Sequence, residues 1–246
     1  VAAPDWSSSF LAVYLFEPDA PLGGDASGNG PELAPVMSPD RTDDAMQGAT
    51  ALVADGTSYL TSPSPAFEPE PTQALTIGGW FRVGGSTDRA LLIDKGDGTP
   101  EGYRLARTPA QALVCAGGGQ DSDTADGTWP DDTWRHAVCR FDPVSGDMDG
   151  FLDGVEALVN TDNLAWNVAT DPLSVGGPGS PFAGQLDEVF FIDAWLEPSS
   201  LRRIHACGID GLLCRCDASE PTEYVSCGRQ ADAGCIGLPD CDQAGP

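Results

Sequence analysis

The sequence predicts an all-β protein: an antiparallel two-sheet jelly-roll sandwich with a small disulfide-rich C-terminal appendage. Three observations support this prediction. The 30 glycines and 21 prolines require many turns and leave little room for long helices. About a dozen short segments have the composition or the two-residue period of β-strands. The helical periodicity that βαβ units need is absent. Two stacked antiparallel sheets would bury the apolar faces of so many short strands.

In the first half of the chain, the sequence signals for β-strands become stronger toward Val83. Phe10–Phe16 is expected to lead, and Pro35 to Gly48 is expected to be irregular. Asp55-Gly56 is a strong hairpin signal between two short strands, Ala51–Val53 and Ser58–Thr61. Leu75–Val83 is a clear strand, and we expect Gly78-Gly79 to form a bulge inside it.

The second half centres on a predicted β-hairpin from Thr133 to Gly154, in which Trp134 to Phe141 alternate and Asp142 to Asp147 form the turn. Gly117 to Asp132 is expected to be a long acidic loop. A short helix is expected to start at Pro198, because proline is favoured in a first helical turn. The remaining expected strands are Ala90–Lys95, Tyr103–Arg107, Ala112–Ala116, Ala157–Val159, Leu173–Val175 and Gln185–Asp193.

Charge and hydropathy exclude several classes of function. The formal net charge of −26 would repel nucleic acid and anionic lipid. No apolar run approaches the ~20 residues that a membrane-spanning helix needs. A content of 41 % hydrophobic residues is enough for a packed core. We therefore expect a secreted or cell-surface protein with no nucleic-acid partner and no membrane span.

Eight cysteines indicate an oxidising compartment. Cys115 and Cys139 lie in two predicted strands, and we expect them to pair. We expect the other six to form three bridges in a tail spanning residues 207–246, beyond a sandwich domain of residues 1–206. Zinc is the competing interpretation for the tight Cys214-Arg215-Cys216 pair, but no CxxC motif occurs and both histidines lie outside the cluster. The six are Cys207, Cys214, Cys216, Cys227, Cys235 and Cys241.

Five motifs follow one another along the chain: Leu15-Phe16 with Asp25–Gly30, Leu75–Val83 with Trp134–Val138, Phe151–Gly154, Val175–Gly177 with Phe182–Val189, and Leu196–Ile204. In this order they resemble the laminin-G-like (LamG) jelly-roll domains of the concanavalin A-like lectin/glucanase superfamily. The resemblance covers about residues 10–205 and implies an extracellular module that binds glycans or proteins, often with a structural calcium ion.

Calcium is the first candidate for chemistry. Asp25 and Asn29, with carbonyls of their glycine-rich turn, offer the oxygen ligands that calcium prefers. The resemblance implies that this turn packs near the last strand, so Asp187 is expected as a third ligand of one structural Ca²⁺. The alternative is an ordinary turn in which Asp25 and Asn29 cap their own backbone.

Catalysis is not expected. A retaining glycosidase needs two carboxyl groups ~5–5.5 Å apart. In the acid pattern of the related glucanases, the first and third acid positions are here Gln185 and Phe190. Strand alternation would turn Asp187 and Glu188 to opposite faces. His136 is expected to be a core histidine with its hydrogen bonds satisfied, and no Gly-x-Ser-x-Gly motif is present.

Two loop tryptophans, Trp129 and Trp166, are the candidates for a ligand surface, and the alternative is that they plug the edge of the sandwich. We therefore expect a recognition or adhesion module for a glycan or an extracellular protein. The runner-up is a structural subunit that associates with itself into a filament or surface layer, with its Pro-rich segment or termini as docking elements.

Overall fold

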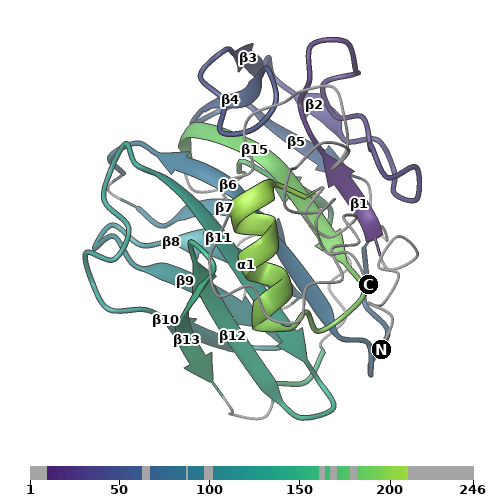
Figure 1. The fold of residues 1–246 in the computed structure, drawn as a ribbon, viewed down its shortest axis with the longest axis vertical. Helices are drawn as coiled ribbons and strands as arrows, with labels where there is room; N and C mark the ends of the chain where they lie inside the picture. Colours follow the sequence, from purple (N-terminus) through teal and green to yellow (C-terminus); the bar gives the residue numbers. More distant parts are fainter. Residues whose placement is uncertain are drawn as a thin grey trace, which may run out of the picture.

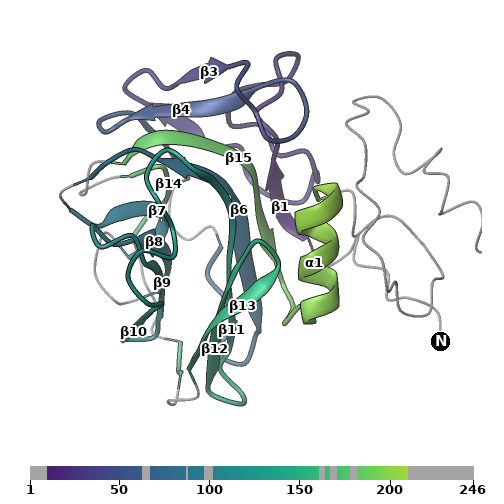
Figure 2. The same cartoon turned by 60° about the vertical axis from the view of Figure 1, so that its left-hand side comes forward.

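The computed structural model describes residues 10–62, 67–86, 88–96, 102–160, 164–166, 171–177 and 182–209. Within these ranges, fifteen strands form two antiparallel sheets that face each other, and one helix lies on the outside of one sheet (Figures 1 and 2). The predicted all-β sandwich is therefore confirmed.

We call the two layers sheet A and sheet B. Sheet A has the order β13 (Val155–Asn160), β12 (Asp147–Leu152), β11 (Trp134–Asp142), β6 (Leu75–Val83), β15 (Ala183–Ile192), β4 (Ala51–Asp55) and β3 (Asp40–Thr42), with β1 (Phe10–Tyr14) also paired to β15. Sheet B has the order β10 (Gln120–Asp123), β9 (Leu113–Gly117), β8 (Tyr103–Arg107), β7 (Ala90–Lys95), β14 (Leu173–Val175), β5 (Tyr59–Ser62) and β2 (Ala34–Val36).

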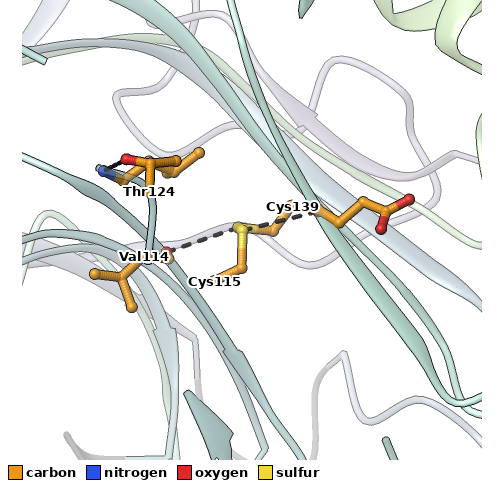
Figure 3. The surroundings of a disulfide bond; sticks show 6 residues. Val114, Cys115, Thr124 and Cys139 are labelled. Atoms are coloured by element: carbon orange, nitrogen blue, oxygen red, sulfur yellow. Dashed lines mark hydrogen bonds between the residues drawn. A yellow bond between two sulfur atoms is a disulfide. The ribbon is translucent and has the colours of Figure 1, made fainter. Parts of the chain in front are cut away.

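The main core lies between the two sheets. Ile77 and Phe81 of β6 pack in one buried cluster with Leu105 of β8 and Leu113 of β9. A disulfide between Cys115 of β9 and Cys139 of β11 crosses this core, with 5.7 Å between the Cα atoms (Figure 3). The bond expected from the sequence is thus present, and it ties sheet B to sheet A.

The predicted hairpin at the centre of the sequence is confirmed, since β11 and β12 pair from Ala137 opposite Leu152 to Asp142 opposite Asp147. The hairpin expected at Asp55-Gly56 is wrong. β4 belongs to sheet A and β5 to sheet B, so this turn carries the chain from one sheet to the other. Asp55 still caps the turn through the amides of Thr57 and Ser58. Local turn chemistry reverses the chain but does not decide which strands pair.

The bulge expected at Gly78-Gly79 lies instead on the neighbouring strand. The register of β15 against β6 shifts between Asp187 and Phe190, and Glu188 has a left-handed φ of 46°. A Cβ on Gly78 would come within 2.7 Å of the Phe190 ring, and one on Gly79 within 3.1 Å of Val189 Cα. The glycines therefore make room for the bulged strand rather than forming the bulge.

Three short strands were not expected. β2 and β3 each have three residues and lie in the segment that the sequence suggested was irregular, and β10 has four residues within the acidic loop. All three are terminal strands of a sheet. Their backbone pairs with a longer strand already in place, so neither periodicity nor strand-forming residues are needed.

The outer face of sheet A is covered by α1 (Pro198–Cys207). Leu201 and Ile204 of the helix pack in a second buried cluster with Val138, Phe151 and Phe190 of the sheet. The helix starts at Pro198 as predicted. No helix in the described part of the chain is long and apolar enough to cross a membrane. The side chain of Cys207 and the whole of Cys214, Cys216, Cys227, Cys235 and Cys241 lie outside the described residues, so the bridges expected in the tail remain predictions.

Candidate functional site

A hollow of about 470 Å³ lies at the rim of the sandwich, next to β1, and is open to solvent. Its lining comes from the single chain segment between Leu15 and Glu32. Four carboxylates line it and no basic side chain does. The lining residues are Leu15, Phe16, Glu17, Asp19, Ala20, Pro21, Gly24, Asp25, Ala26, Gly28, Gly30 and Glu32.

Asp25 fixes the floor of this hollow. Its Oδ1 accepts hydrogen bonds from the amides of Val13 (2.8 Å) and Ser27 (3.0 Å), and its Oδ2 accepts one from the amide of Gly30 (2.7 Å). Burial raises the pKa of Asp25, but these hydrogen bonds outweigh it and hold the pKa below its usual value. The carboxylate is therefore ionised and fully engaged in shaping its own turn.

The wall of the hollow is tied to sheet A through one backbone carbonyl. Phe16 has a left-handed φ of 60°, and its carbonyl accepts hydrogen bonds from Arg41 Nε (2.8 Å) and Thr50 Oγ1 (2.6 Å). Arg41 also donates to the carbonyl of Ala20 (2.6 Å). These contacts hold the loop after β1 in one place, so the hollow is pre-formed.

Each of the three expected calcium ligands is held by hydrogen bonds within the protein. Asp25 is engaged as described, and Asn29 donates its Nδ2 to the carbonyl of Phe10 (3.0 Å). Asp187 accepts from the amides of Met46 (3.0 Å) and Gln47 (2.8 Å), in the loop between β3 and β4. In the described ranges, no three His, Cys, Asp or Glu side chains are grouped to hold a metal. These contacts fit a self-capped turn better than a calcium site, and the ion stays a prediction.

The expectation that Asp187 and Glu188 point to opposite faces is wrong. Glu188 lies in the bulge of β15, where the regular alternation of side chains between the two faces is interrupted. Asp187 lies opposite Trp80, whose ring contacts His205 of α1 at 5.3 Å. Glu188 accepts from the amide of Ile209, just after α1 (3.1 Å). Both carboxyl groups therefore reach the outer face of sheet A. They are 1 % and 9 % exposed, so neither is presented to a substrate in solution.

Burial dominates the electrostatics of this region. It raises the pKa of Asp187 to about 7, against the opposing hydrogen bonds from Gln47, Glu188 and Met46. His136 is fully buried. Burial is the main cause, and the nearby His205 the smaller one, that lowers the pKa of His136 to about 3. Neither ring nitrogen of His136 has a hydrogen-bond partner among the described residues. His136 is thus a neutral core histidine, but the expectation that its hydrogen bonds are satisfied is wrong.

The two tryptophans proposed for a ligand surface act as plugs. Trp129 is fully buried, with its ring 6.3 Å from that of Phe81, so its assignment to a ligand surface does not hold in this structure. Trp166 is half-buried: its Nε1 donates to the carbonyl of Gln73 (2.8 Å), and its ring lies 5.5 Å from Phe141. The large apolar area of an indole explains why a loop turns it into the open edge of a core.

Comparison with known proteins agrees with this fold. The family model described as "Concanavalin A-like lectin/glucanases superfamily" matches residues 54–202. No curated protein matches the chain. Among solved structures, domain 4 of AbnA, a GH43 extracellular arabinanase from Geobacillus stearothermophilus solved with arabinotriose, is 18 % identical, with a TM-score of 0.61, and the match covers 79 % of this chain and 97 % of that one.

Two toxin binding domains are similar in fold. The binding domain of Paraclostridial Mosquitocidal Protein 1 is 15 % identical (TM-score 0.62), and the match covers 82 % of this chain and 53 % of that one. The binding domain of botulinum neurotoxin DC, solved with rat synaptotagmin II, is 12 % identical (TM-score 0.59). That match covers 81 % of this chain and 52 % of the toxin chain. The chain thus spans about half the length of these toxin domains. With a family model matching more than half of its length, the chain belongs to the laminin-G-like family of the concanavalin A-like lectin/glucanase superfamily.

Proposed function

We propose that this chain is a non-catalytic extracellular recognition module that binds a glycan at the rim hollow beside β1. The observation that carries the proposal is the hollow itself, a pre-formed concave surface of about 470 Å³ on a rigid sandwich. The likeness to a domain solved with arabinotriose supports a sugar as ligand. The other polar groups considered above are engaged in internal contacts, which leaves the hollow as the best-supported binding surface.

Two exposed carboxylates give the hollow its chemistry. Asp19 and Glu32 have no hydrogen bond or ion pair within the part of the chain that the structure describes. Carboxylates accept hydrogen bonds from sugar hydroxyls, and these charge-assisted bonds are stronger than neutral ones. Leu15 and Pro21 offer apolar surface in the same lining for the C–H face of a sugar ring. The hollow thus combines the few polar groups and the apolar surface of a small-ligand site.

A glycan array with and without calcium tests this proposal. We expect binding to at least one glycan class, and the double variant Asp19→Asn, Glu32→Gln should weaken it at least about tenfold, because each lost charge-assisted bond is worth ~1.5–3 kcal/mol. Asp126→Asn removes an exposed carboxylate of a different loop and is the matched control. Equal weakening by the control, or no binding to any glycan, would count against the hollow.

Structural calcium is tested separately by melting the protein with calcium and then with EGTA. An ion shared by Asp25, Asn29 and Asp187 should raise the melting temperature by ~5–10 °C at a hundredfold excess over its Kd. Asp25→Asn should remove that gain. An identical melting temperature in both buffers would instead support the self-capped turn.

The alternative, a self-associating structural subunit, is tested by size exclusion with light scattering. A monomer supports the recognition module, and an open polymer supports the subunit.

A further inference from the structure

β13 and β3 end sheet A, and β10 and β2 end sheet B. β1 also has a single strand partner among the described residues, but its Val13 is hydrogen-bonded to Asp25 and Ala26.

The other four strands, which end the two sheets, differ in how they are protected. β3 and β2 have only three residues each, and β2 contains Pro35. β10 has four residues, and two of them are aspartates. Short strands, proline and charge are the devices by which proteins prevent the edge of a sheet from pairing with another chain. β13 has six residues, VEALVN, with no proline, one charged side chain, Glu156, and one register shift, at Ala157.

Two of the exposed side chains of β13 are large and apolar. Val155 is 66 % exposed and Val159 is 59 % exposed, and both are among the most exposed large apolar side chains of the described residues. β13 has a single strand partner there, β12. Figure 2 shows β13 at the free side of sheet A, in front of β11 and β12.

The backbone of β13 can donate and accept on its free side. Asp153 and Gly154 form a two-residue turn with left-handed φ angles of 52° and 73°, and Leu152 lies opposite Val155. In such a hairpin the residues that flank the turn hydrogen-bond to each other, so the next residue, Glu156, directs its N–H and C=O away from β12. The register shift at Ala157 kinks the strand but leaves Val159 opposite Asp149.

We propose that β13 is a docking edge, at which an extended, basic segment of another protein adds a strand to sheet A. Main-chain hydrogen bonds to β13 would supply affinity. Side chains of the added strand would supply specificity by contacting Val155 on the inner face, where it lies opposite Leu152, and Val159 on the outer face, where it lies opposite Asp149. This site is distinct from the rim hollow beside β1 and does not depend on it.

The charges around β13 favour a basic partner. Glu156 is the charged side chain of the strand, 46 % exposed, and its carboxylate lies 3.7 Å from the guanidinium of Arg140. The neighbouring terminal strand, β10, carries Asp121 and Asp123, and Asn160 of β13 donates to Ser122 of β10 at 2.5 Å. Lysine or arginine opposite Glu156 would form a favourable cross-strand pair. A second copy of this chain would bring another formal charge of −26, which disfavours pairing of β13 with itself.

Fluorescence anisotropy with a short labelled peptide, in which lysine alternates with threonine and valine, tests the proposal. We expect saturable binding, and hydrogen exchange of the β13 amides should slow when the peptide is present. Val159→Lys should weaken binding by about tenfold or more, because it places a positive charge and a flexible chain on the docking edge. Val144→Lys is the matched control: it makes the same change at a 72 % exposed valine in the turn between β11 and β12.

Three outcomes would overturn the proposal. Equal weakening by Val159→Lys and Val144→Lys would show attraction by overall charge alone. Equal binding of a peptide with the same composition and a central proline would show that no strand is added, because proline cannot donate to the ladder. Self-association that Val159→Lys abolishes would assign the edge to a second copy of the chain.

Discussion

The two faces of sheet A are both buried, but they are buried by different chemistry. The inner face meets sheet B through aliphatic and aromatic side chains and one disulfide. The outer face meets α1 and the loop between β3 and β4, and there an apolar cluster is interspersed with Arg140, Asp149, His136 and Asp187. The inner face should therefore stabilise the protein equally over a wide pH range, whereas the outer face depends on the charge of a few side chains. The following predictions test that difference.

The largest effect is expected from Arg140→Ala on the outer face. Arg140 is held by Asp149 (3.0 and 2.6 Å) and by the carbonyl of Leu196 (2.6 Å), and its guanidinium lies 4.0 Å from the Trp195 ring. Removing it leaves a buried carboxylate unpaired and frees the segment that leads into α1. We expect a loss of about 3–5 kcal/mol in the free energy of unfolding, measured in urea.

Arg82→Ala is the control for this pair. Arg82 binds Asp44 at 2.5 Å, but these side chains are 33 % and 52 % exposed. An exposed ion pair contributes only ~0–1 kcal/mol. Similar losses of unfolding free energy in Arg140→Ala and Arg82→Ala would mean that burial does not strengthen the contribution of the Arg140–Asp149 pair.

The next largest effect is expected on the inner face. Replacing Cys115 and Cys139 together by alanine opens a crosslink with a sequence separation of 24 residues. Loop-closure entropy predicts a loss of about 3 kcal/mol. This loss should be the same at pH 5 and pH 7, since the surrounding core is apolar. A loss that changes strongly with pH would contradict the contrast between the faces.

The smallest effect concerns His136 and pH. Its pKa is lowered to about 3 when folded, against 6.5 when unfolded, so the unfolded chain binds more protons between these values. Its contribution to stability is therefore complete above pH 6.5 and is lost as the pH falls toward 3. At pH 5 the expected loss is about 2 kcal/mol.

Two nearby groups modify this pH dependence. The pKa of Asp187 is raised to about 7 when folded, so protonating it on acidification works in the opposite direction. Burial also lowers the pKa of His205, which Asp153 partly offsets. The test is therefore the difference between the wild type and His136→Phe, measured by urea unfolding at pH 7 and pH 5. His136→Phe should lose less stability than the wild type between pH 7 and pH 5. Equal losses in the two proteins would show that water solvates the protonated His136 ring in the folded state.

Much of the fold follows from the sequence because the long strands carry their own signal. The bounds of β6, β7, β8 and β14 are those that alternation and turn residues predict. The short strands β3 and β10 pair with their neighbours in the sequence, and the Gly118-Gly119 turn between β9 and β10 is a hairpin signal that went unrecognised within the expected acidic loop. The short strand β2 could not be predicted, because it pairs with β5, which lies more than 20 residues away. For the same reason, Asp55-Gly56 predicts a turn but not the change of sheet.

The candidate site was less predictable. Asp25 is recognisable from its turn, but its full set of backbone donors appears only when β1 lies beside that turn. The burial of Trp129 could not be predicted either, since a loop side chain points wherever the fold leaves apolar space. The two valines of β13 are visible in the sequence, but the lack of a second partner strand for β13 among the described residues depends on the order of the sheet.

The position of β15 has a consequence for how the chain must be made. This strand pairs with β1, β4 and β6, yet it spans residues 183–192 and so leaves the ribosome long after them. Until it emerges, sheet A stays in three pieces: β13 to β6, β4 with β3, and β1. Sheet A can therefore close only after β15 has been synthesised, and until then the chain exposes unpaired strands.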